Sequence, residues 1–123
     1  MSIASFAYAQ TGNFYNNYFQ GNALYVKGQY DKAIEKYSEA IKEGNLAYVY
    51  YNRANCYFAK KDYSKAMEDY NTALQMKSDY AEAFCQRGLV KIATNDNTAC
   101  DDIKKAHKLG LEDAKTELKK HCK

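Results

Sequence analysis

Residues 63–74 read YSKAMEDYNTAL and repeat the pattern of residues 30–41, which read YDKAIEKYSEAI. The two stretches lie 33 residues apart, and a looser third copy includes Ala99, the equivalent of Ala33 and Ala66. One small residue of the pattern recurs at Ala33, Ala66 and Ala99, and a second recurs at Ala40, Ala73 and Ala106. A period in this range is typical of stacked helical repeats, in which each unit buries its apolar face only against its neighbours. We therefore expect a surface that binds a partner rather than an enzyme.

Each unit of the repeat has the pattern of two helices joined by a short turn. In residues 30–41, small and apolar side chains recur at intervals of three and four, which places them on one face of a helix. The chain contains no proline, so the turns between helices depend on Gly, Asn and Asp, as at Gly28 and at residues 95–97. We predict an all-α fold, an α-solenoid of three antiparallel helix hairpins with a terminal capping helix, about seven helices in total.

The repeats also set the expected domain boundaries. We expect a single domain over residues 13–122, preceded by a disordered N-terminus over residues 1–12. The expected repeats span residues 14–46, 47–80 and 81–111, and the expected cap spans residues 112–122. A partly polar capping helix is predicted because a solenoid must cover its last apolar face.

Composition excludes several classes of function. The 123 residues carry 18 Lys and Arg against 15 Asp and Glu, a net charge of +3 that is too small to predict a nucleic-acid partner. No run of about 20 apolar residues is present, so no membrane span is expected. No Gly-rich phosphate loop, paired carboxylate site or activated nucleophile is evident. We expect no catalytic residues, no cofactor and no enzyme activity.

The first ten residues are small, apolar and uncharged. They include Ala7-Tyr8-Ala9, the small-x-small pattern at which signal peptidase cleaves, but not the basic region and longer apolar core of a complete signal. Two interpretations stay open: the sequence begins inside a signal peptide and keeps its remnant, or the segment is an ordinary unstructured N-terminus. The first predicts an exported protein, located in the periplasm or cell envelope or secreted. The alternative is a cytoplasmic protein.

The repeated pattern resembles the tetratricopeptide repeat, a helical hairpin of about 34 residues. The family pattern has a small residue, an aromatic three positions later, a turn, an alanine, a second aromatic and a second alanine. The matching residues are Gly21, Ala33, Tyr37 and Ala40 in the first unit, Ala54, Tyr57, Ala66, Tyr70 and Ala73 in the second, and Gly88, Ala99 and Ala106 in the third. The resemblance covers residues 14–111, and the chain departs from the family in lacking the proline that usually ends a unit.

In this family the first helix of each hairpin lines a concave groove that usually holds a peptide. The resemblance therefore implies a non-catalytic protein–protein interaction scaffold that binds a peptide or partner protein in an aromatic groove. Tyrosine suits this role because it offers a large contact area and one hydroxyl for hydrogen bonding. The resemblance places in the groove Tyr15, Tyr18, Asn22, Tyr25, Val26, Tyr48, Tyr51, Asn55, Phe58, Ala59, Glu82, Cys85, Leu89, Ile92 and Ala93.

A structural, self-associating module is the alternative function. An exposed aromatic face of this kind can instead be buried in a homodimer. A dimer that depends on concentration and is broken by Tyr51→Ala would favour this alternative over peptide binding.

A well-known subclass of the family grips the C-terminal carboxylate of heat-shock chaperones with a clamp of Lys, Asn, Asn, Lys and Arg. The resemblance assigns the two asparagines to Asn22 and Asn55, which are spaced to hydrogen-bond the amides of an extended chain. It assigns the cationic positions to Tyr18, Cys85 and Leu89, and none of these binds a carboxylate strongly. We therefore expect no binding of acidic chaperone tails.

Two of the four cysteines are placed to form a disulfide. If the last repeat helix and the capping helix form an antiparallel hairpin centred on Leu111, Cys100 and Cys122 lie opposite each other. A disulfide there closes a loop of about 20 residues and stabilises the fold by about 3 kcal/mol on a chain-entropy model. It requires an oxidising compartment, in agreement with export. His107 and His121 match no short ligand spacing, so no metal site is expected.

Overall fold

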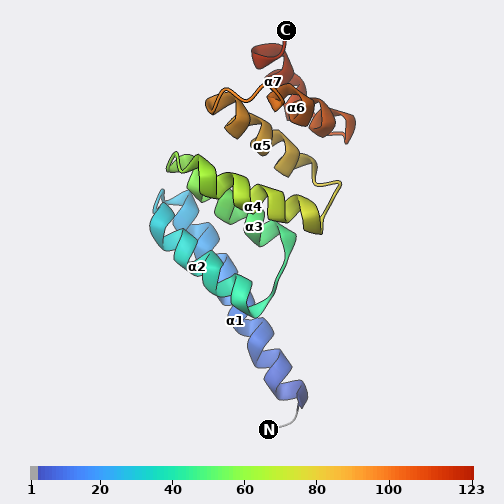
Figure 1. Ribbon diagram of the computed structural model, residues 1–123. Helices are drawn as coiled ribbons and strands as arrows, with labels where there is room; N and C mark the ends of the chain where they lie inside the picture. Colours follow the sequence, from blue (N-terminus) through green and yellow to red (C-terminus); the bar gives the residue numbers. More distant parts are fainter. Residues whose placement is uncertain (1–2) are drawn as a thin grey trace.

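The structure, a computed structural model, describes the backbone of residues 3–123 and the side chains from Gly12 onward. The described residues form helices joined by short connections, with no strand among them (Figure 1). The helices are α1 (Ile3–Val26), α2 (Tyr30–Glu43), α3 (Ala47–Ala59), α4 (Tyr63–Met76), α5 (Ala81–Ala93), α6 (Ala99–Lys108) and α7 (Asp113–His121). These helices confirm the predicted all-α fold.

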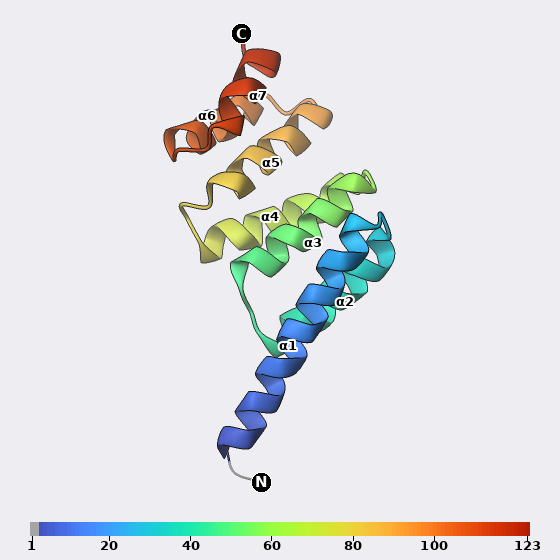
Figure 2. The same ribbon diagram turned by 180° about the vertical axis from the view of Figure 1, so that it is seen from behind.

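Consecutive helices pair into three hairpins, α1 with α2, α3 with α4, and α5 with α6, while α7 packs against α6. Neighbouring hairpins stack through α2 against α3 and through α4 against α5. Figure 1 shows α2 and α4 in front, and Figure 2 shows α1, α3 and α5 from the opposite side. The first helices of the hairpins therefore share one face of the stack, with α3 in contact with both α1 and α5.

A repeated backbone turn ends four of the described helices in this proline-free chain. Gly28 follows α1 with a φ of 75°, and its N–H donates to the carbonyl of Tyr25 at 2.9 Å. This left-handed turn satisfies carbonyl groups that the end of a helix leaves unpaired. The same left-handed conformation recurs after α3, α5 and α6, at Lys61, Asn95 and Gly110.

Small residues let the two helices of a hairpin approach closely. Tyr37 and Tyr70, 33 residues apart, are the largest fully buried side chains. A Cβ atom added at Gly21 would lie 2.7 Å from the ring of Tyr37, and one added at Gly88 would lie 2.6 Å from a side-chain carbon of Ile103. Such distances are too short for a methyl group, so the small positions of the repeat are fixed by packing.

Two arginines each pair with an aspartate of their own hairpin and also bond to the hairpin before it. Arg53 on α3 donates two hydrogen bonds to the carboxylate of Asp69 on α4, at 2.7 and 2.8 Å, and a third to the hydroxyl of Ser38 on α2, at 3.0 Å. One repeat later, Arg87 on α5 binds Asp102 on α6 at the same two distances and also reaches α4. Both aspartates are buried, so these pairs are polar contacts inside the stack.

The N-terminal segment differs from the expectation of disorder. The backbone is helical from Ile3, because residues 3–11 contain no glycine or proline and an established helix extends by one hydrogen bond per added residue. Met1, Ser2 and the side chains around Ala7-Tyr8-Ala9 lie outside the described part, so the signal-peptide remnant stays a prediction. Neither α1 nor any other described helix is both long and apolar enough to cross a membrane.

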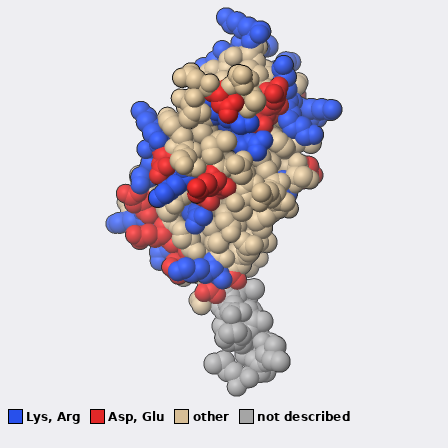
Figure 3. Space-filling view, viewed as in Figure 1, with Lys and Arg blue, Asp and Glu red and all other residues tan. Residues whose placement is uncertain are grey.

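The face of the stack on which α2 and α4 lie carries charges of both signs. Figure 3 shows this face with Lys and Arg interspersed among Asp and Glu. Interspersed charges are typical of a solvated surface and produce no strong field of one sign. This distribution agrees with the small net charge of +3.

Candidate functional site

Two adjoining hollows lie on the face formed by α1, α3 and α5. The first has a volume of about 450 Å³ and is lined by Tyr18, Ala47, Tyr48, Tyr51, Asn52, Lys77, Tyr80 and Glu82. The second has a volume of about 340 Å³ and is lined by Tyr51, Glu82, Cys85, Gln86, Leu89, Leu111, Asp113, Thr116 and Glu117. Tyr51 and Glu82 belong to both, so the hollows adjoin each other at these two residues, and we call the pair of hollows the groove.

Tyrosine rings form the wall of the first hollow. The centroids of Tyr18 and Tyr48 lie 5.0 Å apart in an edge-to-face arrangement, and those of Tyr51 and Tyr80 also lie 5.0 Å apart. Such contacts between aromatic side chains are favourable and orient the rings. The ammonium nitrogen of Lys77 lies over the Tyr80 ring, 5.0 Å from its centroid. The aromatic wall therefore already accommodates a cation.

Acidic side chains surround the second hollow. Glu82 belongs to α5, whereas Asp113 and Glu117 belong to α7. The capping helix thus contributes two charges to the groove in addition to covering the last repeat. The repeat pattern predicts the covering role but gives no signal for this second one.

Asn22 and Asn55 occupy equivalent positions and accept equivalent hydrogen bonds. The Tyr37 hydroxyl donates to Oδ1 of Asn22 at 2.5 Å, and the Tyr70 hydroxyl donates to Oδ1 of Asn55. Burial raises the pKa of both tyrosines, so each hydroxyl keeps its proton and donates. Because the amide oxygen accepts this bond, each asparagine donates further hydrogen bonds through its amide NH₂ group alone.

The structure separates the predicted groove residues into two groups. Those that line the groove are Tyr18, Tyr48, Tyr51, Glu82, Cys85 and Leu89. The predicted residues that do not line it are Tyr15, Asn22, Tyr25, Val26, Asn55, Phe58, Ala59, Ile92 and Ala93. Tyr25 and Phe58 pack instead near the hairpin turns, with ring centroids 5.5 Å from Tyr30 and 5.9 Å from Tyr63. These two aromatic pairs are one repeat apart and serve packing within a hairpin.

Several lining residues were not predicted from the sequence. Asn52 lies four residues after Tyr48, and Gln86 lies four residues after Glu82, so helical spacing from the predicted residues is the signal that could have found them. The connection between α4 and α5 also reaches the groove, and no repeat pattern indicates this. Within the groove, Asn52 donates a hydrogen bond to the Tyr18 hydroxyl at 3.2 Å.

The two free cysteines are buried and unreactive in character. Burial raises the pKa of Cys56 to about 12. Burial, followed by the charges of Glu117 and Asp113, raises the pKa of Cys85 to about 11. Both thiols therefore keep their protons at neutral pH, and neither is an activated nucleophile. Within the described residues, no cluster of three or more His, Cys, Asp or Glu side chains is arranged to hold a metal ion.

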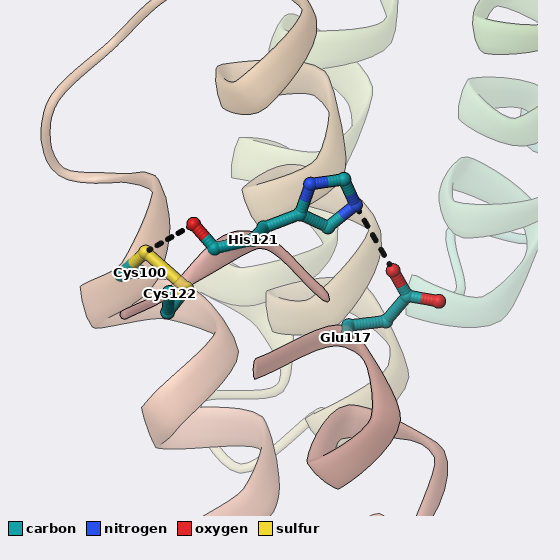
Figure 4. Close-up of a disulfide and its surroundings, with 4 residues drawn as sticks. All are labelled: Cys100, Glu117, His121 and Cys122. Atoms are coloured by element: carbon teal, nitrogen blue, oxygen red, sulfur yellow. Dashed lines mark hydrogen bonds and ion pairs between the residues drawn. A yellow bond between two sulfur atoms is a disulfide. The ribbon is translucent and has the colours of Figure 1, made fainter. Parts of the chain in front are cut away.

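A disulfide between Cys100 and Cys122 joins the first turn of α6 to the residue that follows α7 (Figure 4). The Cα atoms of the two residues lie 5.8 Å apart. Close by, Nε2 of His121 lies 3.4 Å from Oε2 of Glu117. The bond thus holds α7, with its groove residues Asp113 and Glu117, against the last hairpin.

Comparison with protein-family models identifies the repeat. The tetratricopeptide repeat is matched by residues 47–80 and, in a second model, by residues 14–44. The chain belongs to the tetratricopeptide repeat family. The two matched segments correspond to the hairpins α1–α2 and α3–α4 and confirm the resemblance seen in the sequence. No curated protein is significantly similar in sequence.

Solved structures extend the match over this whole tetratricopeptide repeat domain. The second such domain of human RPAP3, in complex with the HSP70 peptide SGPTIEEVD, is 30% identical with a TM-score of 0.84, covering 93% of this chain and 98% of that one. The first domain of Spaghetti (RPAP3), bound to the HSP90 peptide SRMEEVD, is 26% identical with a TM-score of 0.83, covering 89% and 90%. The domain of Arabidopsis OM64 is 26% identical with a TM-score of 0.86, covering 90% and 95%. These matches include the third hairpin, which the family models leave out.

Proposed function

We propose that this protein is a non-catalytic scaffold that binds an extended segment of a partner polypeptide in the groove. The observation that carries the proposal is the pair of adjoining hollows on the face of α1, α3 and α5, with Tyr51 lining both. Tyrosine is favoured at binding surfaces because it buries a large area while losing little side-chain freedom. No arrangement of activated groups in the described residues suggests a reaction in the same place.

The comparisons support a peptide as the ligand. The similar domains of human RPAP3 and of Spaghetti were each solved with a short peptide bound. Both have this fold over most of the chain, including all three hairpins. None of the similar structures reported above has a second copy of the domain named as its partner, so the comparisons favour peptide binding over the homodimer alternative.

The face of α1, α3 and α5 offers two kinds of contact to an extended chain. The rings of Tyr18, Tyr48 and Tyr51 present apolar faces to side chains of the peptide. Asn22 and Asn55 lie on α1 and α3 outside the lining of the two hollows, and their amide NH₂ groups donate to carbonyls of a peptide that continues along these helices. In this arrangement the tyrosines supply buried contact area, and the asparagines fix the position of the peptide along the helices.

Replacement of Tyr51 is the test of this function. Random decapeptides displayed on phage are selected on the wild-type protein, and the enriched peptides are synthesised with a fluorescent label. Tyr51→Ala is expected to weaken their binding by at least about 10-fold in fluorescence polarisation, since large aromatic residues at the centre of an interface carry much of its binding energy. Thermal melting by circular dichroism checks that the variant is folded.

Tyr15→Ala is the matched control for Tyr51→Ala. Tyr15 is half exposed and belongs to the aromatic residues predicted for the groove, but it does not line either hollow. Its replacement is expected to leave the affinity within about twofold of wild type, because contacts outside an interface contribute little. Equal affinity of wild type and Tyr51→Ala would contradict binding in the groove. A dimer that Tyr51→Ala dissociates in light scattering would favour the homodimer instead.

Export and a cytoplasmic location predict different states of Cys100 and Cys122. We propose export, because a disulfide at this position persists in an oxidising compartment and is reduced in the cytoplasm. Cells are quenched in acid and their thiols alkylated under denaturing conditions, and the protein is then examined by mass spectrometry. Export predicts that Cys100 and Cys122 escape alkylation until they are reduced. Alkylation of both without reduction would favour the cytoplasmic alternative.

A further inference from the structure

The charges that line the groove are mostly negative. Glu82, Asp113 and Glu117 face the hollows, against the single cation of Lys77. The peptides bound to the similar domains carry two glutamates and an aspartate at their C-terminal ends, in SGPTIEEVD and SRMEEVD. Side chains of the same sign in a groove and in its ligand repel each other. The lining of this groove therefore does not suit peptides of that kind.

Glu82 occupies the central position in the groove. It is exposed, and it belongs to both hollows. Within the described residues, none of the ion pairs involves Glu82. Its charge, after burial and the neighbouring Tyr51, helps to raise the pKa of Tyr80. A carboxylate with solvent access and no internal counter-ion is suited to meet a cation of a ligand.

The acidic residues of α7 extend the negative region to the far end of the groove. Asp113 forms no ion pair among the described residues, and Glu117 meets only the imidazole of His121. Both carboxylates raise the pKa of the Cys85 thiol beside them, after the larger effect of burial. The second hollow is therefore negative along its α7 side, with no lysine or arginine in its lining.

The aromatic wall next to Glu82 also favours a positively charged ligand. A cation over an aromatic ring is attracted by the negative face of the ring. Lys77 shows this contact with Tyr80, and the ring of Tyr51 lies 5.0 Å from that of Tyr80. Aromatic faces and a carboxylate thus meet at one place, which is the combination that binds a lysine or arginine side chain.

We infer that the groove takes an extended peptide that carries basic residues, one of which reaches Glu82 beside the rings of Tyr51 and Tyr80, and another the carboxylates of Asp113 and Glu117. The inference rests on the proposed function and names the chemistry of its partner. It distinguishes this protein from the similar domains that were solved with acidic peptides. Ligand specificity then follows from the charge of the groove and not from the fold.

The test measures which charge the groove selects. The decapeptides enriched on the wild-type protein are scored for net charge. The most enriched one is made with an amidated C-terminus, and its affinity is measured for wild type, for Glu82→Lys and for Glu68→Lys. Glu68→Lys is the matched control, because it makes the same charge change at an exposed residue of α4 outside both hollows. The peptide SRMEEVD is measured alongside.

We expect enriched peptides that are rich in Lys and Arg. Glu82→Lys is expected to weaken their binding by at least about 10-fold, and Glu68→Lys by no more than about twofold, because the repulsion acts at short range in salt. SRMEEVD is expected not to bind. Enrichment of acidic peptides, micromolar binding of SRMEEVD, or unchanged affinity in Glu82→Lys would each overturn the basic-peptide inference while leaving the scaffold proposal in place. If the wild type enriches no peptide more strongly than Tyr51→Ala does, both the basic-peptide inference and the scaffold proposal are overturned.

Discussion

Arg53→Met is expected to lower the free energy of unfolding by about 3 kcal/mol, because it leaves the carboxylate of Asp69 buried without its cation. Asp69 is 5% exposed and receives two hydrogen bonds from Arg53, at 2.7 and 2.8 Å. Methionine keeps much of the apolar stem of the arginine side chain, so the lowered free energy of unfolding reports mainly on the missing charge. Urea denaturation followed by circular dichroism measures the change.

Two further variants separate this cause from a general loss of packing. In Arg53→Met/Asp69→Leu both charges are removed, and we expect most of the lost stability to return, because a buried pair replaced by apolar residues costs little. Lys42→Met removes the cation of the exposed pair with Glu39, whose side chains are 70% and 54% exposed, and should change stability by less than about 0.5 kcal/mol. A double variant no more stable than Arg53→Met would refute the explanation by buried charge.

Reduction of the Cys100–Cys122 disulfide is expected to lower the free energy of unfolding by about 3 kcal/mol on a chain-entropy model, because the unfolded chain loses a covalent constraint across 22 residues. The measurement compares urea denaturation with and without a phosphine reductant. Cys122→Ser should unfold at the same urea concentration as the reduced wild type. The double variant Cys100→Ser/Cys122→Ser serves as the control, since the reductant should have no effect on it.

Thiol counting checks the same bond independently. Cys56 and Cys85 are buried, so alkylation is carried out in denaturant, where all free thiols are accessible. We expect two reactive thiols before reduction and four after it. Four reactive thiols in the unreduced, air-oxidised protein would contradict the disulfide.

The repeat period made the fold predictable. The small residues at Gly21 and Gly88 leave no room for a Cβ atom, so packing holds them at intervals that can be read in the sequence. Arg53 and Asp69 recur as Arg87 and Asp102, and this recurrence was a usable signal for the buried pairs. It was missed because charged residues within a helix are ordinarily taken to be solvated.

The groove was predictable only in part, because two of its walls depend on contacts between repeats. The positions of Tyr18, Tyr48 and Tyr51 follow from their place on the first helices. The contributions of Tyr80 and Glu117 arise from the connection before α5 and from the docking of α7, and neither belongs to the repeated pattern. The repeat pattern therefore predicts the aromatic side of the groove but not the negative charge that α7 contributes to it.

The contacts of Arg53 and Arg87 across three helices have a consequence for the energetics of binding. Each arginine joins its own hairpin to the preceding one, so the spacing of the three hairpins is set before a partner arrives. Such a groove is a preorganised template, and the ordering cost of association falls on the peptide. A peptide that is held extended in advance, for instance by cyclisation, should therefore bind more tightly than a flexible one of the same sequence.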